Sequence, residues 1–278
     1  MTPEPRRPLV FFHAGLGKVA STYLQKRVFP ALDGICYIPR DRFRSHSRIV
    51  ARAEHDRYLI SRECGKRLQP RLEEIHRFYP DARILLFFRR HDEWIASHYR
   101  RYVKNGGVRD LDGYLDLDGD DGIWTRDQLE YMPMIERVRQ RFGRDPFVLT
   151  YDRLRADGDD FNRRLADYLG ATIDPSRLRT EPVHASYAVA RLARLRRINR
   201  HLGLAEPEIA GPTGGTRAGH RRLRLARSYL LLGAAGLLKP DPDPREALTP
   251  RAVIERIREY YADDWRSVVA FEAAQFDG

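Results

Sequence analysis

The sequence predicts an α/β protein with a mostly parallel central sheet, and two segments carry this prediction. Residues 84–88 form an unbroken apolar run, which suits a strand buried on both faces, as in a parallel sheet. Residues 10–12 form a second apolar run near the N-terminus. In both places a short polar or glycine-rich turn and then a helix-forming stretch follow the strand, as in parallel α/β folds.

The other elements follow from apolar spacing and from cap residues. A short apolar stretch at 35–38 and a strand with a turn over 146–154 complete the strand-forming segments. Gly170 is the expected C-cap of one helix, and Thr249 and Pro250 are the N-cap and first residue of the last one. Helices are expected over residues 24–32, 68–79, 131–142, 161–169 and 191–200 and from residue 250 onward. Residues 111–124, rich in Asp and Gly, are expected to form a mobile loop.

The turn after the first predicted strand has the composition of an anion-binding loop. Gly15 and Gly17 let the backbone approach a ligand closely, and Lys18 adds a positive charge. Ser21 and Thr22 add hydroxyl donors where a helix begins, and the first N–H groups of a helix have no partner within it. The segment therefore predicts a site for a phosphate or sulfate group.

The loop does not match the nucleoside-triphosphate pattern G-x-x-x-x-G-K-[ST]. Phe12 stands where the first glycine belongs, and Val19 stands where a hydroxyl would bind Mg²⁺. A site for Mg-ATP is therefore disfavoured, although an ATP-dependent kinase remains an alternative.

A second motif follows the apolar run at 84–88. Arg89 comes directly after this run, Asp92 is available as the N-cap of the next helix, and Ser97 lies eight residues after Arg89. An arginine at the carboxyl end of a strand can bind a phosphate with two parallel hydrogen bonds, and a serine two helical turns later can donate another.

Together the two motifs resemble those of the sulfotransferases that use 3′-phosphoadenosine-5′-phosphosulfate (PAPS) and release PAP. The spacing His-x-Gly-x-x-Lys-x-x-Ser-Thr-x-Leu-Gln from residue 13 resembles their 5′-phosphosulfate loop. Arg89 and Ser97 resemble their 3′-phosphate motif. Many members read Lys-Thr-Gly-Thr-Thr in the loop, and this chain departs from that pattern at Val19 and Ala20.

The resemblance implies a P-loop-like sulfotransferase fold, with three α/β/α layers and a helical C-terminal part. It also implies that PAPS binds without a metal ion. The cofactor-binding residues would be Gly15, Gly17, Lys18, Val19, Ala20, Ser21, Thr22, Arg89 and Ser97.

The resemblance further implies two catalytic residues. Lys18 would stabilise the charge that grows on the leaving phosphate. Residues 55–63 resemble the second core strand of bacterial relatives, which ends Ser-x-Glu, so Glu63 would lie beside Lys18 as general base. His46, His55 and Asp41 remain alternative bases, whereas His13 is expected to support the loop.

Bulk properties limit the other classes of function. The 278 residues carry a net charge of +11, which favours anionic ligands without choosing among them. Two cysteines form no metal or disulfide pattern, and no signal or transmembrane segment is seen, so a cytoplasmic protein is expected. The acceptor is left open as a glycan, a small metabolite or a lipid, and no specific nucleic acid is expected.

The chain shows no internal repeat or linker, so one domain is expected over residues 1–278. Within it we expect a flexible N-terminus at 1–8, a core at 9–185 and a helical part at 186–278. Residues 221–239, basic and then apolar, indicate a buried helix or a peripheral contact with a membrane. A non-catalytic basic protein that binds nucleotide, nucleic acid or membrane also remains an alternative.

Overall fold

The computed structural model describes residues 7–178, 188–203, 217–237 and 248–276. Of the expected flexible N-terminus, residues 1–6 lie outside the described residues. Residue contacts divide the described chain into two units. We call residues 7–90, 131–178 and 264–276 the sheet unit, and residues 91–130, 188–203, 217–237 and 248–263 the helical unit.

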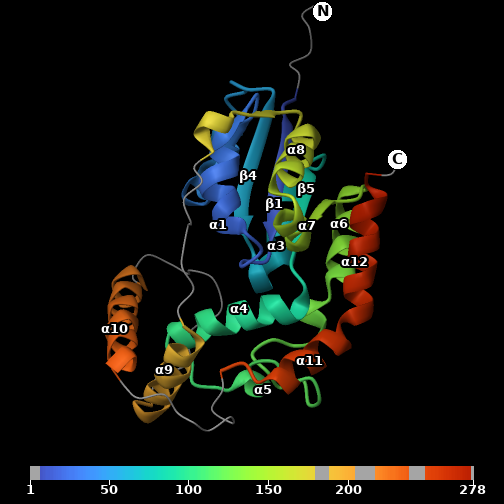
Figure 1. Ribbon diagram of the computed structural model, residues 1–278. Helices are drawn as coiled ribbons and strands as arrows, with labels where there is room; N and C mark the ends of the chain where they lie inside the picture. The colour runs from blue at the N-terminus through green and yellow to red at the C-terminus, as the bar shows by residue number, and fades with distance from the viewer. Residues whose placement is uncertain (1–6, 179–187, 204–216, 238–247, 277–278) are drawn as a thin grey trace, which may run out of the picture. The chain divides into compact units, whose positions relative to one another are not determined.

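A five-stranded parallel sheet forms the centre of the sheet unit (Figure 1). Its strands lie in the order β3-β4-β1-β5-β6 and pair in parallel throughout. Their bounds are β1 Leu9–Gly15, β3 Cys36–Ile38, β4 Arg57–Glu63, β5 Arg83–Phe88 and β6 Phe147–Thr150. The predicted parallel sheet is thereby confirmed, including both strands on which the prediction depended.

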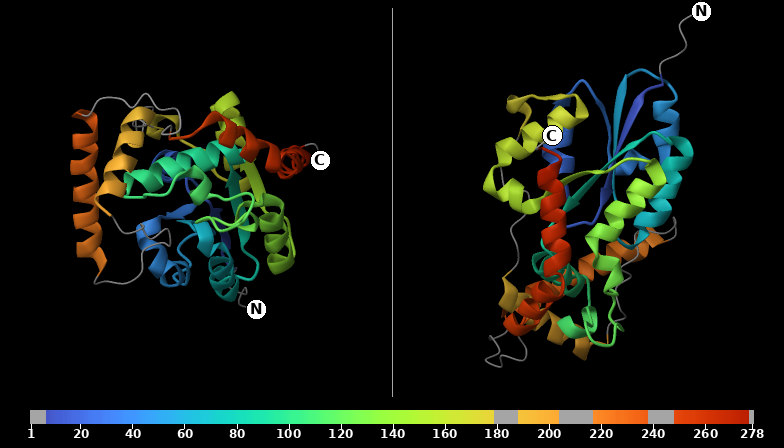
Figure 2. Two further views of the ribbon diagram at one scale, coloured as in Figure 1. Left: turned by 90° about the horizontal axis from the view of Figure 1, so that it is seen from below. Right: turned by 90° about the vertical axis from the view of Figure 1, so that its right-hand side faces the viewer.

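Helices cover both faces of this sheet (Figure 2, right). Successive residues of a strand point to opposite faces. On one face Phe11 packs edge-on against Tyr168 of α8 (Gly158–Leu169). On the other face, Phe88 of β5 stacks on Tyr131 at the start of α6 (Tyr131–Phe142), beside α3 (Leu68–Phe78). The arrangement is the predicted three-layer α/β/α fold.

The helical segment after β1 is irregular. It begins as α1 (Ser21–Tyr23), continues as a π-helix over Leu24–Val28 and ends as a 3₁₀-helix over Phe29–Ala31. Leu32 then starts the short strand β2 (Leu32–Asp33), which pairs with β7 (Thr172–Ile173). The predicted single helix over 24–32 is therefore corrected to three short helical forms, and π-turns are frequent at functional sites.

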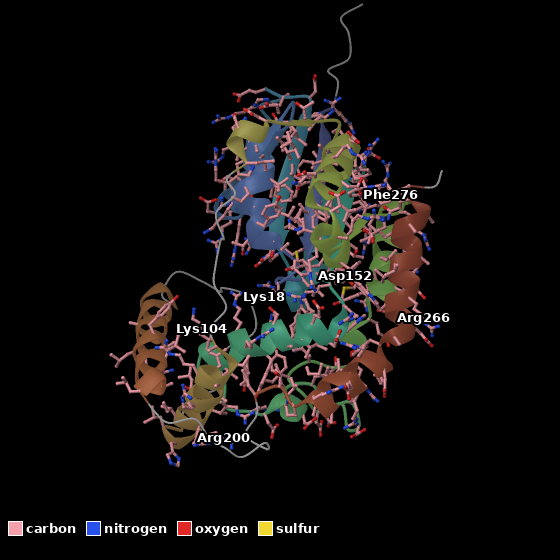
Figure 3. The ribbon with its side chains drawn as sticks, viewed as in Figure 1. Lys18, Lys104, Asp152, Arg200, Arg266 and Phe276 are labelled. Atoms are coloured by element: carbon pink, nitrogen blue, oxygen red, sulfur yellow. The ribbon has the colours of Figure 1, made fainter. Side chains whose placement is uncertain are left out.

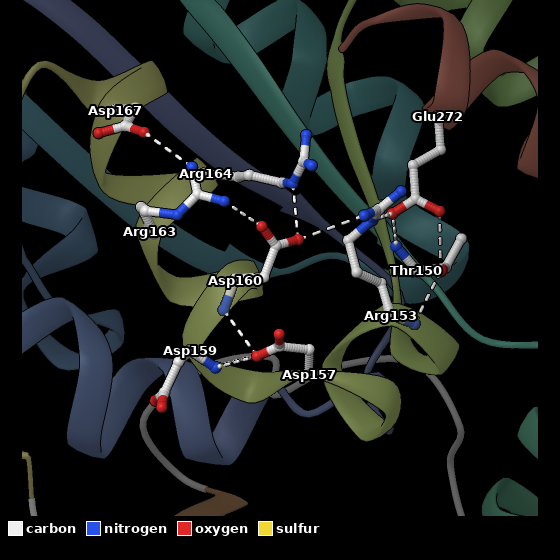
Figure 4. A network of polar contacts seen from close by, with 9 residues as sticks. All are labelled: Thr150, Arg153, Asp157, Asp159, Asp160, Arg163, Arg164, Asp167 and Glu272. Carbon is white, nitrogen blue, oxygen red and sulfur yellow. Dashed lines mark hydrogen bonds and ion pairs between the residues drawn. The ribbon is translucent and has the colours of Figure 1, made fainter. Parts of the chain in front are cut away.

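Glu272 of α12 (Ala262–Ala274) and Gln275, the residue after this helix, bind the outer edge of β6. Glu272 accepts a hydrogen bond from Thr150 N at 2.9 Å, and Gln275 Oε1 accepts one from Val148 N at 3.0 Å. Figure 4 shows Glu272 facing Thr150 and Arg153, the latter on α7 (Tyr151–Ala156). An edge strand with unpaired N–H groups invites pairing with another chain, and these contacts remove that liability.

Several predicted helix ends are confirmed and others are corrected. Gly170 closes α8 with a φ of 59°, in the left-handed region that glycine tolerates. In the helical unit, α4 (His91–Lys104) starts one residue before Asp92, so Asp92 is not its N-cap. The Asp92 carboxylate is instead buried and accepts two hydrogen bonds from Arg258 of α11 (Arg251–Tyr260). Pro250, not Thr249, is the N-cap of α11.

Buried aromatic residues hold the segment expected to be a mobile loop. Its start is the helix α5 (Leu111–Tyr114), and Leu115 bridges to Trp124. Tyr114 and Trp124 are both buried, and Trp124 Nε1 donates to the Tyr114 hydroxyl at 3.1 Å. Most of the Asp and Gly residues on which the loop prediction depended belong to the exposed turn between Tyr114 and Trp124.

The remaining helices are α2 (His46–Val50), α9 (Val189–His201) and α10 (Arg217–Leu237). α9 packs on both α4 and α10 within the helical unit. In the described part of the chain, none of the helices has the length and apolar character needed to span a bilayer.

Candidate functional site

The carboxyl ends of the parallel strands meet at one edge of the sheet, and the chain leaves this edge in two directions. After β1 the chain continues to β3 on one side, and after β5 it continues to β6 on the other. Neighbouring strands whose connections diverge in this way create a crevice, which is where open α/β sheets bind ligands. The loop that carries Lys18 follows β1 (Figure 3), and Arg89 follows β5. The sheet topology therefore places the two predicted anion-binding elements after adjacent strands at the same edge of the sheet.

The loop after β1 has the backbone geometry of an anion site. Lys18 has a φ of 72° and Ala20 has a φ of 62°, on either side of Val19. Alternation between right- and left-handed backbone turns successive N–H groups toward one concave side, the arrangement called a nest. Ala20 therefore occupies a conformation that favours the glycine found there in many sulfotransferases.

Val19 shows why this loop differs from a magnesium nucleotide site. Its side chain is 2% exposed and belongs to the apolar core. Ser21, two residues later, is also buried, and its hydroxyl donates a short hydrogen bond to Glu63 Oε1. No hydroxyl follows Lys18 directly, in the place where the nucleoside-triphosphate loop needs one for Mg²⁺.

Glu63 lies at the end of β4, where it pairs in register with Gly15 of β1. Its carboxylate lies against the loop, because a Cβ placed on Gly17 would lie 3.4 Å from Glu63 Oε2. The side chain is 19% exposed, and Arg40 Nη1 lies 3.8 Å from the same oxygen. Glu63 therefore borders the loop as the sequence predicted, with a partly open carboxylate.

His13 has the supporting role that was expected. Its Nδ1 lies 2.8 Å from Ser61 Oγ, and Gln25 Nε2 donates to the same hydroxyl at 3.0 Å. Burial lowers the pKa of His13 to about 3, so the ring is neutral at physiological pH. These contacts join β1, β4 and the π-helix directly beneath the loop.

Two aromatic residues orient Arg89. Its guanidinium carbon lies 4.4 Å from the centre of the Tyr151 ring, and the Tyr131 hydroxyl donates to the Arg89 carbonyl at 2.9 Å. Sequence reasoning did not find these two residues, although Tyr151 follows a strand at the same edge of the sheet. Ser97 is half-buried on α4 of the helical unit, and its role beside Arg89 stays a prediction.

The alternative bases are not equally placed. His46 Nδ1 hydrogen-bonds the Tyr79 hydroxyl at 2.9 Å, shortly before β5 begins, and burial lowers the pKa of His46. His55 packs edge-on against Tyr58 at the start of β4. His55 therefore lies at the amino end of β4, at the other end of this strand from Glu63, whereas the His46 ring packs on Phe43. Asp41 follows β3 at the carboxyl edge and is exposed, and the choice of base among these residues and Glu63 stays a prediction.

Within the described residues, no group of three or more His, Cys, Asp or Glu side chains is arranged to hold a metal ion. Cys36 and Cys64 are both free thiols.

Comparison with known proteins gives matches to solved structures only. No protein-family model and no curated protein matches the sequence. A sulfotransferase from Alicyclobacillus acidocaldarius matches with a TM-score of 0.49 and 14% identity, over 82% of this chain and 95% of that one. The mouse sulfotransferase SULT7A1 complexed with PAP matches with a TM-score of 0.41 and 14% identity, over 92% of this chain and 90% of that one. Both matched proteins are sulfotransferases.

Proposed function

We propose that this chain is a sulfotransferase that moves the sulfuryl group of PAPS to a hydroxyl or amine of an acceptor and releases PAP. One observation carries the proposal. The nest at Lys18–Ala20 and the guanidinium of Arg89 follow adjacent strands at the diverging point of the sheet, and a carboxylate lies against the nest. This combination suits a nucleotide that carries phosphates at both the 3′ and 5′ positions of its ribose. The carboxylate would then lie beside it as a proton acceptor.

The residues fit an anionic nucleotide of this kind. The nest would present backbone N–H groups and the Lys18 side chain to a phosphosulfate group. Arg89, held by Tyr151, would bind the 3′-phosphate with Ser97 as a second donor. Because Val19 is buried and apolar, binding would not need a metal ion beside the loop.

PAPS supplies the sulfuryl group, and the chain supplies charge and proton transfer. The acceptor oxygen or nitrogen forms a bond to sulfur while the bond from sulfur to the 5′-phosphate oxygen breaks. Lys18 stabilises the charge on that departing oxygen, an interaction typically worth about 3 kcal/mol. Glu63 takes the acceptor proton, and the Ser21 hydroxyl holds its carboxylate in place.

An ATP-dependent kinase is the competing function. It would need a Mg²⁺ ligand next to Lys18, and the buried Val19 cannot provide one. A non-catalytic basic protein would explain the charge of +11 but not a carboxylate held against an anion-binding loop.

Thermal melting with PAP, ADP and Mg-ATP tests the proposal. At 100-fold excess over its dissociation constant a ligand stabilises a protein by about 2.7 kcal/mol, which raises the melting temperature by several degrees. We expect a rise with PAP that Arg89→Ala abolishes. Arg77→Ala, which removes an exposed arginine of α3, is the matched control. A rise with Mg-ATP instead, or with none of the three, overturns the proposal.

For location and partners we also propose a cytoplasmic enzyme with a peripheral membrane contact through α10. The free thiols of Cys36 and Cys64 agree with a reducing compartment. Helices α9 and α10 each contain five arginines and no acidic residue. On α10, Leu232 and Ala235 are buried, whereas Leu230 and Leu237 are 75% and 89% exposed. A basic helix with an exposed apolar stripe suits an anionic lipid surface.

A further inference from the structure

Three arginines from different elements lie together at the carboxyl edge of β3 and β4. Arg62 and Arg71 both approach the buried Phe43, with guanidinium carbons 4.7 Å and 5.4 Å from the centre of its ring. Arg40 Nη1 lies 3.8 Å from Glu63 Oε2, and its charge acts on Arg62. We call Arg40, Arg62 and Arg71 the arginine cluster.

The fold places these side chains together at the edge that carries the site. Arg40 begins the 3₁₀-helix Arg40–Ser45 that follows β3, and Arg71 lies in the first turns of α3, which follows β4. Arg62 precedes Glu63 on β4, so the two side chains leave the strand on opposite faces. Glu63 faces the loop with Lys18, and Arg62 faces Phe43 on the outer side of the same strand.

The charge of the cluster is only partly neutralised within the protein. Arg71 forms an ion pair with Glu74, and Arg40 has the longer contact with Glu63. Among the residues that the structure describes, the Arg62 guanidinium has no hydrogen bond or ion pair and rests on the Phe43 ring. The pKa of Arg62 is lowered, first by partial burial and then by Arg71 and Arg40. An oxyanion would relieve this repulsion, and guanidinium groups bind oxyanions through paired hydrogen bonds.

The position of the cluster indicates which molecule would carry that oxyanion. The nucleotide phosphates are proposed at the ends of β1 and β5, whereas the cluster lies at the ends of β3 and β4. Glu63 lies between these regions, touching the loop on one side and Arg40 on the other. A molecule that delivers its proton to Glu63 could therefore reach the cluster from the side away from the nucleotide.

We propose that the arginine cluster binds an oxyanion group of the acceptor, so that the acceptor is an acidic molecule carrying a carboxylate, sulfate or phosphate near the reacting hydroxyl or amine. The assignment to the acceptor rests on the proposed function. The oxyanion site itself rests only on the arrangement of Arg40, Arg62 and Arg71.

Nuclear magnetic resonance of the full chain, labelled with ¹⁵N-arginine and saturated with PAP, tests the site directly. The probes are inorganic sulfate, inorganic phosphate and glucuronate, with neutral glucose as the uncharged counterpart. The Nε–H signals of Arg62 and Arg71 are assigned from Arg62→Lys and Arg71→Lys. We expect both signals to shift saturably with the three anions, at one common dissociation constant for each anion, and not with glucose.

Arg48 and Arg77 provide the matched control, because both are exposed and lie on α2 and α3 away from the carboxyl edge. Non-specific ion binding would shift the Nε–H signals of Arg48, Arg77, Arg62 and Arg71 alike and without saturation. That result would overturn the oxyanion site. In Arg62→Gln/Arg71→Gln, the anion-dependent shift of the Arg40 signal should fall at least tenfold, whereas Arg48→Gln/Arg77→Gln should leave it unchanged.

The same spectra separate this proposal from the proposed function. The Arg89 signal reports PAP binding. If sulfate shifts the signals of the arginine cluster and PAP does not shift that of Arg89, the sulfotransferase proposal is contradicted and the anion site is supported. If PAP shifts the Arg89 signal and the anions do not shift those of the cluster, only the anion site is contradicted. If PAPS alone shifts Arg62 and Arg71 and PAP does not, the oxyanion belongs to the donor, and the assignment to the acceptor is wrong.

Discussion

Ser21 donates its hydroxyl hydrogen to Glu63 across the mouth of the anion-binding loop, although the two residues lie 42 positions apart in the sequence. Ser21 is the first residue of α1, and Glu63 is the last residue of β4. The bond joins the element proposed to hold the phosphosulfate to the carboxylate proposed to take the proton. If the proposed phosphosulfate recruited the Ser21 hydroxyl, Glu63 Oε1 would lose this donor and become available to accept a proton.

Glu63→Gln tests the proposed base. The amide keeps the shape of the side chain and cannot accept a proton, so we expect kcat to fall by roughly 10²–10⁴. The melting shift caused by PAP should remain, because the loop and Arg89 are unchanged. Glu73→Gln, on the exposed side of α3, is the control and should keep full activity. Full kcat in Glu63→Gln would show that Glu63 is not the base and would leave Asp41, His46 and His55 as candidates.

Ala20→Gly tests whether the loop is strained. A residue with a Cβ in the left-handed region costs about 1–2 kcal/mol, and glycine avoids this cost while losing about 0.4–1 kcal/mol through its freer unfolded state. We expect the variant to melt roughly 1–4 °C higher than the wild type. Ala96→Gly, in the middle of α4, is the matched control and should melt lower. A decrease in both variants would mean that the φ of 62° at Ala20 carries no strain.

The acid stability of the protein should depend on His13. Burial depresses its pKa to about 3 from the usual 6.5, so the folded state keeps this ring neutral while the unfolded state takes up a proton below pH 6.5. The contribution of His13 is therefore complete above pH 6.5 and is lost as the pH falls toward 3, by about 1.4 kcal/mol per pH unit.

Urea unfolding between pH 4 and pH 8 measures this dependence. His13→Gln should lower the free energy of unfolding at pH 8, because it disturbs the contact with Ser61, and should flatten its decline below pH 6.5. His46→Gln should flatten the same decline, since burial also lowers the pKa of His46. An unchanged slope in His13→Gln would show that the ring can be protonated in the folded state.

Glu272 should be essential for stability, because it joins α12 to the edge of the sheet. Its buried carboxylate accepts hydrogen bonds from Thr150 N, Thr150 Oγ1 and Arg153 Nε, each at 2.9 Å. Glu272→Ala leaves these donors without partners, and we expect a loss of about 3 kcal/mol. Glu255→Ala, which removes an exposed partner of Arg251, should change the free energy of unfolding by less than about 0.5 kcal/mol. Chemical unfolding of both variants decides the comparison.

Elements with a local signal were predictable from the sequence. The apolar runs of β1 and β5, the apolar spacing of α6 and the glycine at 170 each act within a few residues of chain, and all four were identified. The anion-binding loop was also found, because its glycines, lysine and hydroxyls are contiguous. The positive φ of Lys18 was not predicted, since nothing in the sequence marks it, whereas the glycine that many sulfotransferases have in place of Ala20 marks that position.

Features that depend on distant residues were missed. Asp264 caps α6 by accepting from Tyr131 N at 2.8 Å and Met132 N at 3.0 Å, although more than a hundred residues separate them. Asp92, expected to cap its own helix, is instead bound by Arg258. In both cases tertiary packing determines which charged residue reaches the helix, and local propensity cannot identify that residue.

The membrane contact proposed for α10 can be tested without knowing the acceptor. Leu230 and Leu237 are seven residues apart, so they lie on the same face of α10, and each would bury an apolar side chain in a lipid interface. We expect the full chain to sediment with vesicles of phosphatidylcholine and phosphatidylglycerol, and to bind pure phosphatidylcholine vesicles much more weakly. Leu230→Ser/Leu237→Ser should lower the affinity at least tenfold, because each leucine contributes about 2 kcal/mol when buried.

Phe78→Ser, at an exposed apolar position of α3, controls for a general loss of hydrophobicity and should bind like the wild type. The charge contribution is tested separately, because added salt should weaken binding by screening the arginines of α9 and α10 from the lipid headgroups. If the double variant binds vesicles normally, α10 does not contact lipid. If instead the wild type dimerises in solution and the double variant is monomeric, the stripe is an interface between two copies of the chain, and the membrane proposal is wrong.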